Sequence, residues 1–265
     1  MKNKGLIITL IIILSIIVIG LIAFLCMCLT GNLNLQFGLK MWGRKSNNII
    51  YDTSYEIDSI DNLEVLSSAG DINFKESTDG KIRVIAYGQD ENDLEVTLNE
   101  NKLKVDYSKY KNTGWGFNNY VNDIIVYIPK DYSKEINIDL DYGNVEMIDL
   151  ENATINIKED CGSIKLGKVK NTSIENDYGD VEIEAILNKC TIESNCGDIK
   201  INKIQIAQNS YIKSDYGDVK ISEINDIYID AKTDLGDVKV SQSNRHSEIT
   251  LKIEDDCGDI KVGDN

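Results

Sequence analysis

Aliphatic and polar residues alternate with a period of two through residues 136–265. The alternation is clearest around seven similar segments, which read DYGNVEM (141–147), DCGSIKL (160–166), DYGDVEI (177–183), NCGDIKI (195–201), DYGDVKI (215–221), DLGDVKV (234–240) and DCGDIKV (256–262). Residues two and four positions after each glycine, and five positions before it, are almost all aliphatic. This pattern predicts strands with one buried face and excludes helices.

The seven segments form a repeat with one glycine in each unit: Gly143, Gly162, Gly179, Gly197, Gly217, Gly236 and Gly258. The glycines lie 17 to 22 residues apart, and a period of about 19 residues is typical of one structural unit stacked on the next. The D-x-G-D sequence places glycine where a turn needs a positive φ, and the preceding aspartate can bond to the turn backbone. We therefore predict an all-β protein, a parallel β-solenoid with seven clear coils over residues 136–265.

Residues 49–135 predict a β cap on the N-terminal end of the solenoid. Ile60 to Phe74 reads as a degenerate copy of the repeat, and several further strand patterns follow it. Glu100 and Asn101 predict a hairpin turn between two of those strands. We expect antiparallel pairing here, because an open solenoid end would expose unpaired strand edges.

The first 29 residues predict a transmembrane anchor, and residues 30–48 a stalk. Gly5 to Leu29 is free of charge and rich in Ile and Leu, long enough to cross a bilayer and too long for a signal peptide. The short cationic segment that precedes it favours retention of the N-terminus inside the cell. We expect a single-pass protein of the plasma membrane with an extracellular C-terminal domain.

Charge is distributed unevenly along the chain. All 44 acidic residues follow residue 45, whereas the first 45 residues carry only five cations, and the net charge of the whole chain is −16. Such an acidic chain excludes nucleic acid as a partner, because phosphate binding needs a basic face. It permits metal ions, basic peptides or amino-bearing glycans.

These residues together resemble a bacterial "putative adhesin" family, a β-strand-repeat domain of unknown function. The resemblance rests on the x-G-D-[VI]-x-[IV] repeats, the early copy at 69–72 (AGDI) and the segment IVYIP at 125–129, and it covers about residues 50–265. It implies membrane-attached or surface proteins, some of them linked to envelope-stress sensing. It supplies no catalytic residues.

Two acidic columns flank the glycines, and one of them is a candidate calcium ladder through Asp180, Asp198, Asp218 and Asp237. Carboxylates stacked ~4.8 Å apart repel, and Ca²⁺ between them would relieve the repulsion. The alternative is turn capping with neutralisation by a neighbouring column that holds lysine at most levels, such as Lys200 and Lys239. We favour capping and expect no bound metal or cofactor.

The residue before each glycine alternates in size: Tyr142, Cys161, Tyr178, Cys196, Tyr216, Leu235 and Cys257. It shares its parity with the aliphatic columns, so we predict that Cys161, Cys190, Cys196 and Cys257 are buried free thiols. Cys161 and Cys196 would lie two coils apart, about 9.6 Å, beyond the reach of a disulfide or of a shared zinc ion. Free thiols are unusual outside the cell, which leaves a cytoplasmic domain or an anaerobic host as alternatives.

Other candidate site residues are few. Trp115 and Phe117, in a Gly/Asn loop at 113–120, could stack on a sugar or pack over the cap, and we favour packing. His246 lies in the polar segment SQSNRHSE, and we expect it to be a solvated loop residue.

Three functions follow as hypotheses. The first is a non-catalytic adhesin-like module that binds a cell-wall polymer. The second is an envelope-stress regulator that binds cationic peptides or a membrane protein. The third, a carbohydrate-active β-helix enzyme, is disfavoured because the carboxylates repeat regularly, as turn chemistry requires, and are not paired in a cleft. We therefore expect no catalytic residues.

Overall fold

The computed structural model describes residues 44–108 and 120–263. The expected anchor at 1–29 and the residues Trp115 and Phe117 lie outside this part of the chain. The helices in the described part are two 3-10 turns, Ile57–Ser59 and Glu91–Asp93, and neither could cross a membrane. The described residues from Lys45 onward belong to one compact unit.

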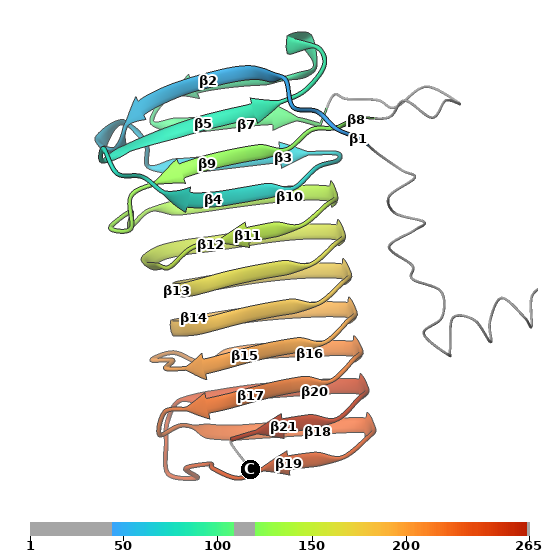
Figure 1. Ribbon diagram of the computed structural model, residues 1–265. Helices are drawn as coiled ribbons and strands as arrows, with labels where there is room; N and C mark the ends of the chain where they lie inside the picture. The colour runs from blue at the N-terminus through green and yellow to red at the C-terminus, as the bar shows by residue number, and fades with distance from the viewer. Residues whose placement is uncertain (1–43, 109–119, 264–265) are drawn as a thin grey trace, which may run out of the picture. The chain divides into compact units, whose positions relative to one another are not determined.

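A single curled sheet of 19 strands builds this unit, and it folds into two parallel layers (Figure 1). Layer A holds the strands before the glycine turns, in spatial order β7 (Lys102–Tyr107), β3 (Asn62–Ser67), β10 (Glu135–Tyr142), the second parts of β12 (Leu150–Cys161), β13 (Ile164–Tyr178) and β14 (Val181–Cys196), β16 (Ser210–Tyr216), β20 (Thr250–Cys257) and β18 (Tyr228–Leu235). Layer B holds the strands after the turns, β9 (Ile124–Ile128), β4 (Ile72–Glu76), β11 (Val145–Met147), the first parts of β13 and β14, β15 (Ile199–Ile204), β17 (Val219–Ile224), β21 (Ile260–Val262) and β19 (Val238–Val240). The β-solenoid-like repeat is therefore confirmed.

The aliphatic columns form the core between the two layers. Val145, Ile164, Val181, Ile199, Val219 and Ile260, two positions after the glycines, are completely buried. Their equivalents four positions after and five positions before the glycines are also buried, except in the coil of β18 and β19. Each fully buried aliphatic side chain stabilises the fold by about 1.5–3 kcal/mol, so stacking of the columns supplies what a lone coil lacks.

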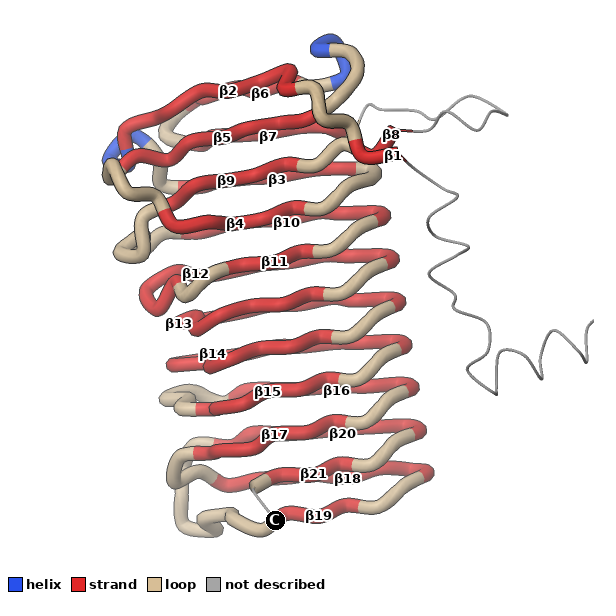
Figure 2. The backbone as a smooth tube through the Cα atoms, in the orientation of Figure 1, coloured by secondary structure: helices blue, strands red, loops and turns tan. Residues whose placement is uncertain are grey.

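The last coil of the chain does not lie at the end of the stack. Cys257 of β20 pairs with Tyr216 of β16 on one side and with Leu235 of β18 on the other. The C-terminal coil (β20, β21) is thus inserted between the fifth and sixth repeats, and the sixth (β18, β19) forms the terminal level (Figure 2). The sixth repeat has Ala231 where the others have Ile, and the nine-residue segment 241–249 leads the chain past it. The exchanged order of the last two repeats buries the coil of β20 and β21, which is more apolar than the coil of β18 and β19.

The N-terminal cap is smaller than expected. Among the described strands, antiparallel pairing joins β2 (Ile49–Glu56) to β5 (Lys81–Tyr87), β5 to β9, and β6 (Glu95–Asn99) to β7. The positive φ angles of Glu100 and Asn101 confirm the hairpin turn. Nevertheless, β3, β4, β7 and β9, which precede residue 135 in the chain, also pair parallel and so extend the parallel stack beyond β10 and β11. The remaining strands, β1 (Arg44–Lys45) and β8 (Tyr120–Val121), are two residues long.

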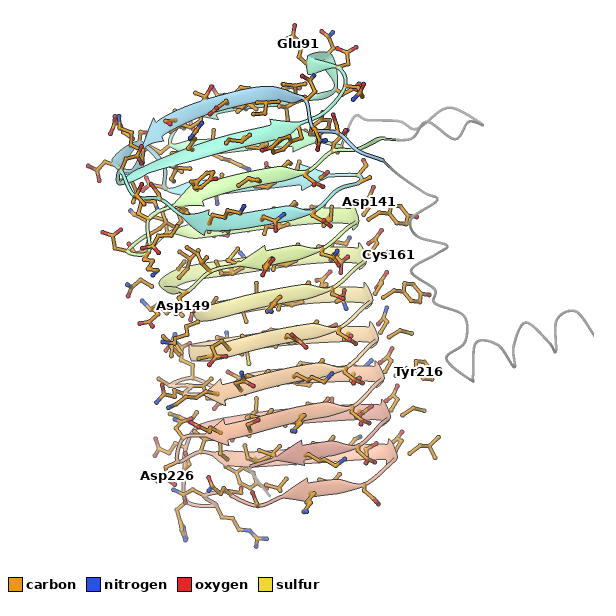
Figure 3. All side chains as sticks on the ribbon, in the orientation of Figure 1. Glu91, Asp141, Asp149, Cys161, Tyr216 and Asp226 are labelled. Atoms are coloured by element: carbon orange, nitrogen blue, oxygen red, sulfur yellow. The ribbon has the colours of Figure 1, made fainter. Side chains whose placement is uncertain are left out.

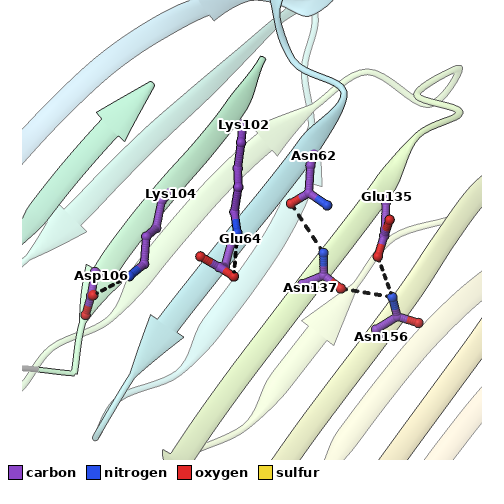
Figure 4. Close-up of polar contacts among 8 residues, drawn as sticks. All are labelled: Asn62, Glu64, Lys102, Lys104, Asp106, Glu135, Asn137 and Asn156. Carbon is purple, nitrogen blue, oxygen red and sulfur yellow. Dashed lines mark hydrogen bonds and ion pairs between the residues drawn. The ribbon is translucent and has the colours of Figure 1, made fainter. Parts of the chain in front are cut away.

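An amide ladder crosses the same boundary on the outer face of layer A. The Asn156 side chain donates to Asn137 Oδ1 (2.9 Å), and Asn137 donates to Asn62 Oδ1 (3.3 Å). Figure 4 shows this ladder beside the ion pairs Lys102–Glu64 (2.9 Å) and Lys104–Asp106 (2.9 Å). Polar side chains in register on the outer face therefore support the same stacking as the core.

The turn glycines stack directly on one another. Gly179 has φ +144°, and a Cβ atom there would overlap the carbonyl oxygen of Gly162 on the level above. The other turn glycines meet their neighbours in the same way, and Gly258 faces Gly217 while Gly236 faces Gly258, as the inserted coil requires. Each turn therefore needs glycine for its close approach, and every turn except that of Gly258 also needs it for a positive φ.

Replacement of Gly179 by alanine tests this stacking. We expect Gly179→Ala to lower the free energy of unfolding by about 3 kcal/mol or more, because a Cβ overlap with backbone adds to the cost of the positive φ. Gly80→Ala is the matched control, since Gly80 has φ +74° and no atom within 4 Å of the added Cβ. Urea unfolding of both variants measures the difference, and equal losses would contradict the stacking.

Candidate functional site

One edge of the stack carries a regular stripe of side chains, which we call the turn edge. It comprises the four residues of each level from two before the turn glycine to one after it. In spatial order the residues immediately before the glycines are Tyr142, Cys161, Tyr178, Cys196, Tyr216, Cys257 and Leu235. Insertion of the last coil thus makes the alternation of tyrosine and cysteine unbroken.

The large members of this stripe project into solvent. Tyr142, Tyr178, Tyr216 and Leu235 are between 56% and 70% exposed, and Figure 3 shows Tyr216 pointing away from the turns. The expectation that this column is buried was wrong, because at this edge the chain itself crosses from layer A to layer B. No opposing layer remains to cover the side chain.

The four cysteines that the structure describes are free thiols, as expected, but only one of these four is buried. Cys190 is completely buried, and burial raises the pKa of its thiol to about 12. Cys161, Cys196 and Cys257 are half-buried between the tyrosines. Burial and the carboxylates of Glu159, Asp160 and Asp177 raise the pKa of Cys161, so it remains a thiol and is a poor nucleophile.

Acidic side chains flank the stripe on its layer A side. In spatial order this row is Asp141, Asp160, Asp177, Asn195, Asp215, Asp256 and Asp234. Most of these side chains are exposed, and Asn195 donates to Asp177 Oδ1 (2.7 Å). Burial, with the charges of Asp160 and Asp139, raises the pKa of Asp141. The row presents a carboxylate next to each tyrosine, and the one beside Tyr216, Asp215, is paired with Lys213 (2.6 Å).

A second acidic row, formed by the residues that follow the turn glycines, lies on the layer B side of the stripe and caps the turns. Asp180 Oδ1 accepts the backbone N–H of Asp198 (2.9 Å), Asp198 accepts that of Asp218 (3.0 Å), and Asp218 accepts that of Asp259 (2.9 Å). Asp259 in turn accepts the N–H of Asp237 (3.0 Å). Lys200 and Lys261 pair with Asp198 (3.4 Å) and Asp259 (3.2 Å). These hydrogen bonds are those of turn capping, the alternative to a calcium ladder. Within the described residues, no three His, Cys, Asp or Glu side chains are placed to hold a metal ion.

A buried polar column lies just inside the turn edge, three positions before the glycines. Its members are Glu159, Asn176, Ser194, Ser214 and Asp255, with Thr233 half-buried at the terminal level. The Asn176 amide donates to the carbonyl of Gly179 (2.6 Å) and the Ser214 hydroxyl to that of Gly217 (3.1 Å). Sequence reasoning missed this column, although polar residues at an inward parity could have revealed it.

Two acids occupy this donor position. Burial raises the pKa of Glu159 to about 8, with contributions from Asp160 and Asp177. Burial also raises the pKa of Asp255 to about 6, although its Oδ1 accepts the N–H of Cys257 (3.1 Å). Both Glu159 oxygens are buried without a hydrogen-bond partner. The position faces a glycine carbonyl, which needs a donor, so the protonated acid fits it better than the carboxylate.

Other surfaces offer less. An open hollow of about 690 Å³ on the outer face of layer B is lined by alternating signs of charge, including Lys165, Lys200, Glu146 and Glu182. His246 is exposed, as expected, and its backbone N–H donates to Asn244 Oδ1 (2.9 Å). The turn edge is therefore the surface that combines exposed rings with charge of one sign, an arrangement that suits cations with apolar stems.

Comparison with known proteins agrees with this fold. The sequence profile of the family described as Toastrack DUF4097 matches residues 60–263. The chain is similar to a solved structure from Bacteroides fragilis called a "putative adhesin", with 19% identity, 82% of this chain and 97% of that chain covered, and a TM-score of 0.50. A "putative lipid binding protein" from Parabacteroides distasonis gives 16% identity, coverage of 82% and 98%, and a TM-score of 0.40. None of the curated proteins compared with the chain matches it.

Stability should depend on pH through Glu159. Its pKa is raised from 4.5 to about 8 in the folded protein, so its contribution is complete below pH 4.5 and is lost as the pH rises through 8. We expect Glu159→Gln to remove a decline of up to about 4 kcal/mol in the free energy of unfolding. Urea unfolding between pH 4.5 and 9 measures it, with Glu175→Gln, an exposed acid of β13, as the control. A parallel pH profile for Glu159→Gln and the wild type would contradict the buried acid.

Proposed function

Because the chain belongs to the Toastrack DUF4097 family, which carries an adhesin-like repeat fold, we propose that it is a non-catalytic binding module whose turn edge holds an extended cationic chain. The observation that carries the proposal is the exposed column of Tyr142, Tyr178 and Tyr216 beside the largely exposed acidic row. An alkyl-ammonium side chain can place its stem on a ring and its charge against a carboxylate.

The spacing of the rings selects the shape of the ligand. Tyrosines recur at every second level, which is about 9.6 Å for levels ~4.8 Å apart. One turn of polyproline II has three residues, covers about 9.3 Å and returns every third side chain to the same face. In that conformation a basic residue at every third position meets successive tyrosines. Basic peptides and amino-bearing surface polymers share this chemistry.

Regular repetition supports binding in preference to catalysis. Each level of the turn edge offers the same few groups, whereas acid–base chemistry needs two carboxylates with different environments in one cleft. Of the edge thiols, Cys161 has a raised pKa, which makes it a poor nucleophile. A repeated surface of this kind suits a polymer that makes many weak contacts.

The proposal places the module at the cell surface. Gly5 to Leu29 is uncharged and long enough to anchor the chain in the plasma membrane, with the acidic module outside. An anchored acidic edge would concentrate basic chains from the surroundings, because its field attracts them over about a Debye length.

Loss of the rings should weaken binding of a Lys-x-x repeat peptide. We expect the triple variant Tyr142→Ser, Tyr178→Ser, Tyr216→Ser to bind about tenfold to hundredfold more weakly, at roughly 0.5–1 kcal/mol for each exposed cation–π contact. Calorimetric titration measures the affinity. Leu98→Ser, which removes an exposed apolar side chain far from the turn edge, should leave it unchanged. A Lys-x-x-x peptide should bind less well, and equal affinity for both peptides would count against the spacing.

The charges should matter through their position and not only through their number. We expect Asp160→Asn, Asp177→Asn and Asp256→Asn together to reduce peptide affinity several-fold at 0.05 M salt, because they remove carboxylates beside the rings. The control converts Asp139, Glu175 and Glu193, exposed acids of layer A away from the edge, to their amides and changes the net charge equally. If both sets weaken binding alike, the peptide responds only to net charge, and the turn edge is not its site.

A further inference from the structure

The terminal level of the stack leaves a strand edge open. Among the strands of residues 44–108 and 120–263, β18 pairs only with β20, and β19 only with β21. At the level above, the amide of Gly258 donates to Leu235 O (3.0 Å) and that of Ile260 to Asp237 O (2.9 Å). The equivalent amides of the terminal level, Gly236 N–H and Val238 N–H, have no further level to meet. They form two aligned donors at the open edge.

Apolar side chains accompany these donors. Val238 is 44% exposed and Leu235 is 70% exposed, whereas Val219 and Ile260, the equivalents of Val238, are completely buried. Segment 241–249 covers only the beginning of the edge, where Asn244 N–H bonds Ile227 O (2.8 Å) and Ile229 N–H bonds Ser243 Oγ (3.0 Å). From Ala231 to Val240 the edge remains uncovered, and such an edge is a template for another strand.

We propose that a second copy of this chain occupies this edge, end to end, about a two-fold axis at Thr233. β18 of one copy then pairs antiparallel with β18 of the other, so that residues whose numbers add to 466 lie opposite each other. Ala231, at the core position of β18, faces Leu235 of the second copy, which lies at the exposed turn edge. Lys232 faces Asp234 of the second copy on the outer side, once in each direction. The stack thereby continues through the junction with both aliphatic and charged side chains matched.

Charge decides between the two possible two-fold axes. An axis along the strands would bring the turn edges of the two copies together, and Asp234 and Asp237 would meet their own counterparts. The axis at Thr233 reverses the strands, so the turn edge of one copy lies beside the segment 241–249 of the other. That segment carries the exposed pair of opposite charges Arg245 and Glu248, so it does not repeat the negative charge of the acidic turn. The like-charged arrangement is disfavoured.

A disulfide at the axis tests the register in the full chain. Directly opposite residues of antiparallel strands have Cα atoms about 4.5–5.5 Å apart, within the range of a disulfide. We expect Thr233→Cys to form covalent dimers under mild oxidation, in a background with Cys26, Cys28, Cys161, Cys196 and Cys257 changed to serine and buried Cys190 retained. The control is Ser173→Cys on the exposed outer face of β13. Dimers that form equally fast at positions 173 and 233 overturn the proposal.

Exchange of the charges at Lys232 and Asp234 tests the pairing of these two residues across the junction. A second series with native Thr233 makes the test independent of the folding of the cysteine variant. In the Thr233→Cys background, Lys232→Asp should slow dimer formation about threefold to tenfold, because two like-charged pairs replace two opposite ones. Adding Asp234→Lys should restore the rate. A parallel light-scattering series with native Thr233 should show the same order of dimer fractions. Failure of the double variant to recover, in either series, overturns the proposed pairing, whereas peptide binding is judged separately with the tyrosine triple variant, which leaves β18 unchanged.

Discussion

The contact between stacked glycines is the constraint on which this structure depends. At each turn the carbonyl oxygen of one glycine occupies the space in which a Cβ atom on the next would lie, as Gly162 and Gly179 illustrate. Only glycine permits this approach, and it keeps equivalent residues of successive levels in register. The aliphatic columns can then fill the space between the layers. The same register aligns exposed side chains that contribute nothing to the core, including the tyrosines of the turn edge.

Close stacking of identical turns also accumulates like charges, and the structure handles them in two ways. Carboxylates after the glycine are used as acceptors for the amides of the next level, with Asp180 and Asp198 as examples. Carboxylates before the glycine have fewer partners and face solvent. Inside the edge, burial and the nearby charges of Asp160 and Asp177 raise the pKa of Glu159 and so favour its protonated form. The acidic surface is therefore concentrated beside the rings, where a cationic ligand would find it.

Much of this architecture could be predicted from the sequence, because a period of two and a recurring glycine dictate strands, turns and the buried face. The predicted burial of Tyr142 and its equivalents was wrong, because the alternation of buried and exposed residues holds for a strand inside a sheet and not for the corner at which the chain changes layers. The order of the last two coils could not be predicted, because a repeat defines the unit and not the sequence in which units stack. The buried polar column at Glu159 and Asn176 was not predicted, because the prediction of the buried face rested on aliphatic residues alone.

The exchange of the last two coils connects the two surfaces. Stacked in chain order, the stripe would run from Tyr216 to Leu235 and then to Cys257, and the alternation of rings would break. Insertion of β20 and β21 places Cys257 directly after Tyr216 and moves Leu235 to the end. The repeat with the weakest aliphatic column, marked by Ala231, thereby becomes the terminal level and leaves its edge open. Two copies joined at that edge would carry their rings on opposite edges of the joined stack, because the strands reverse direction at the junction. Each copy would then bind its own polymer chain, so the two turn edges work independently of each other.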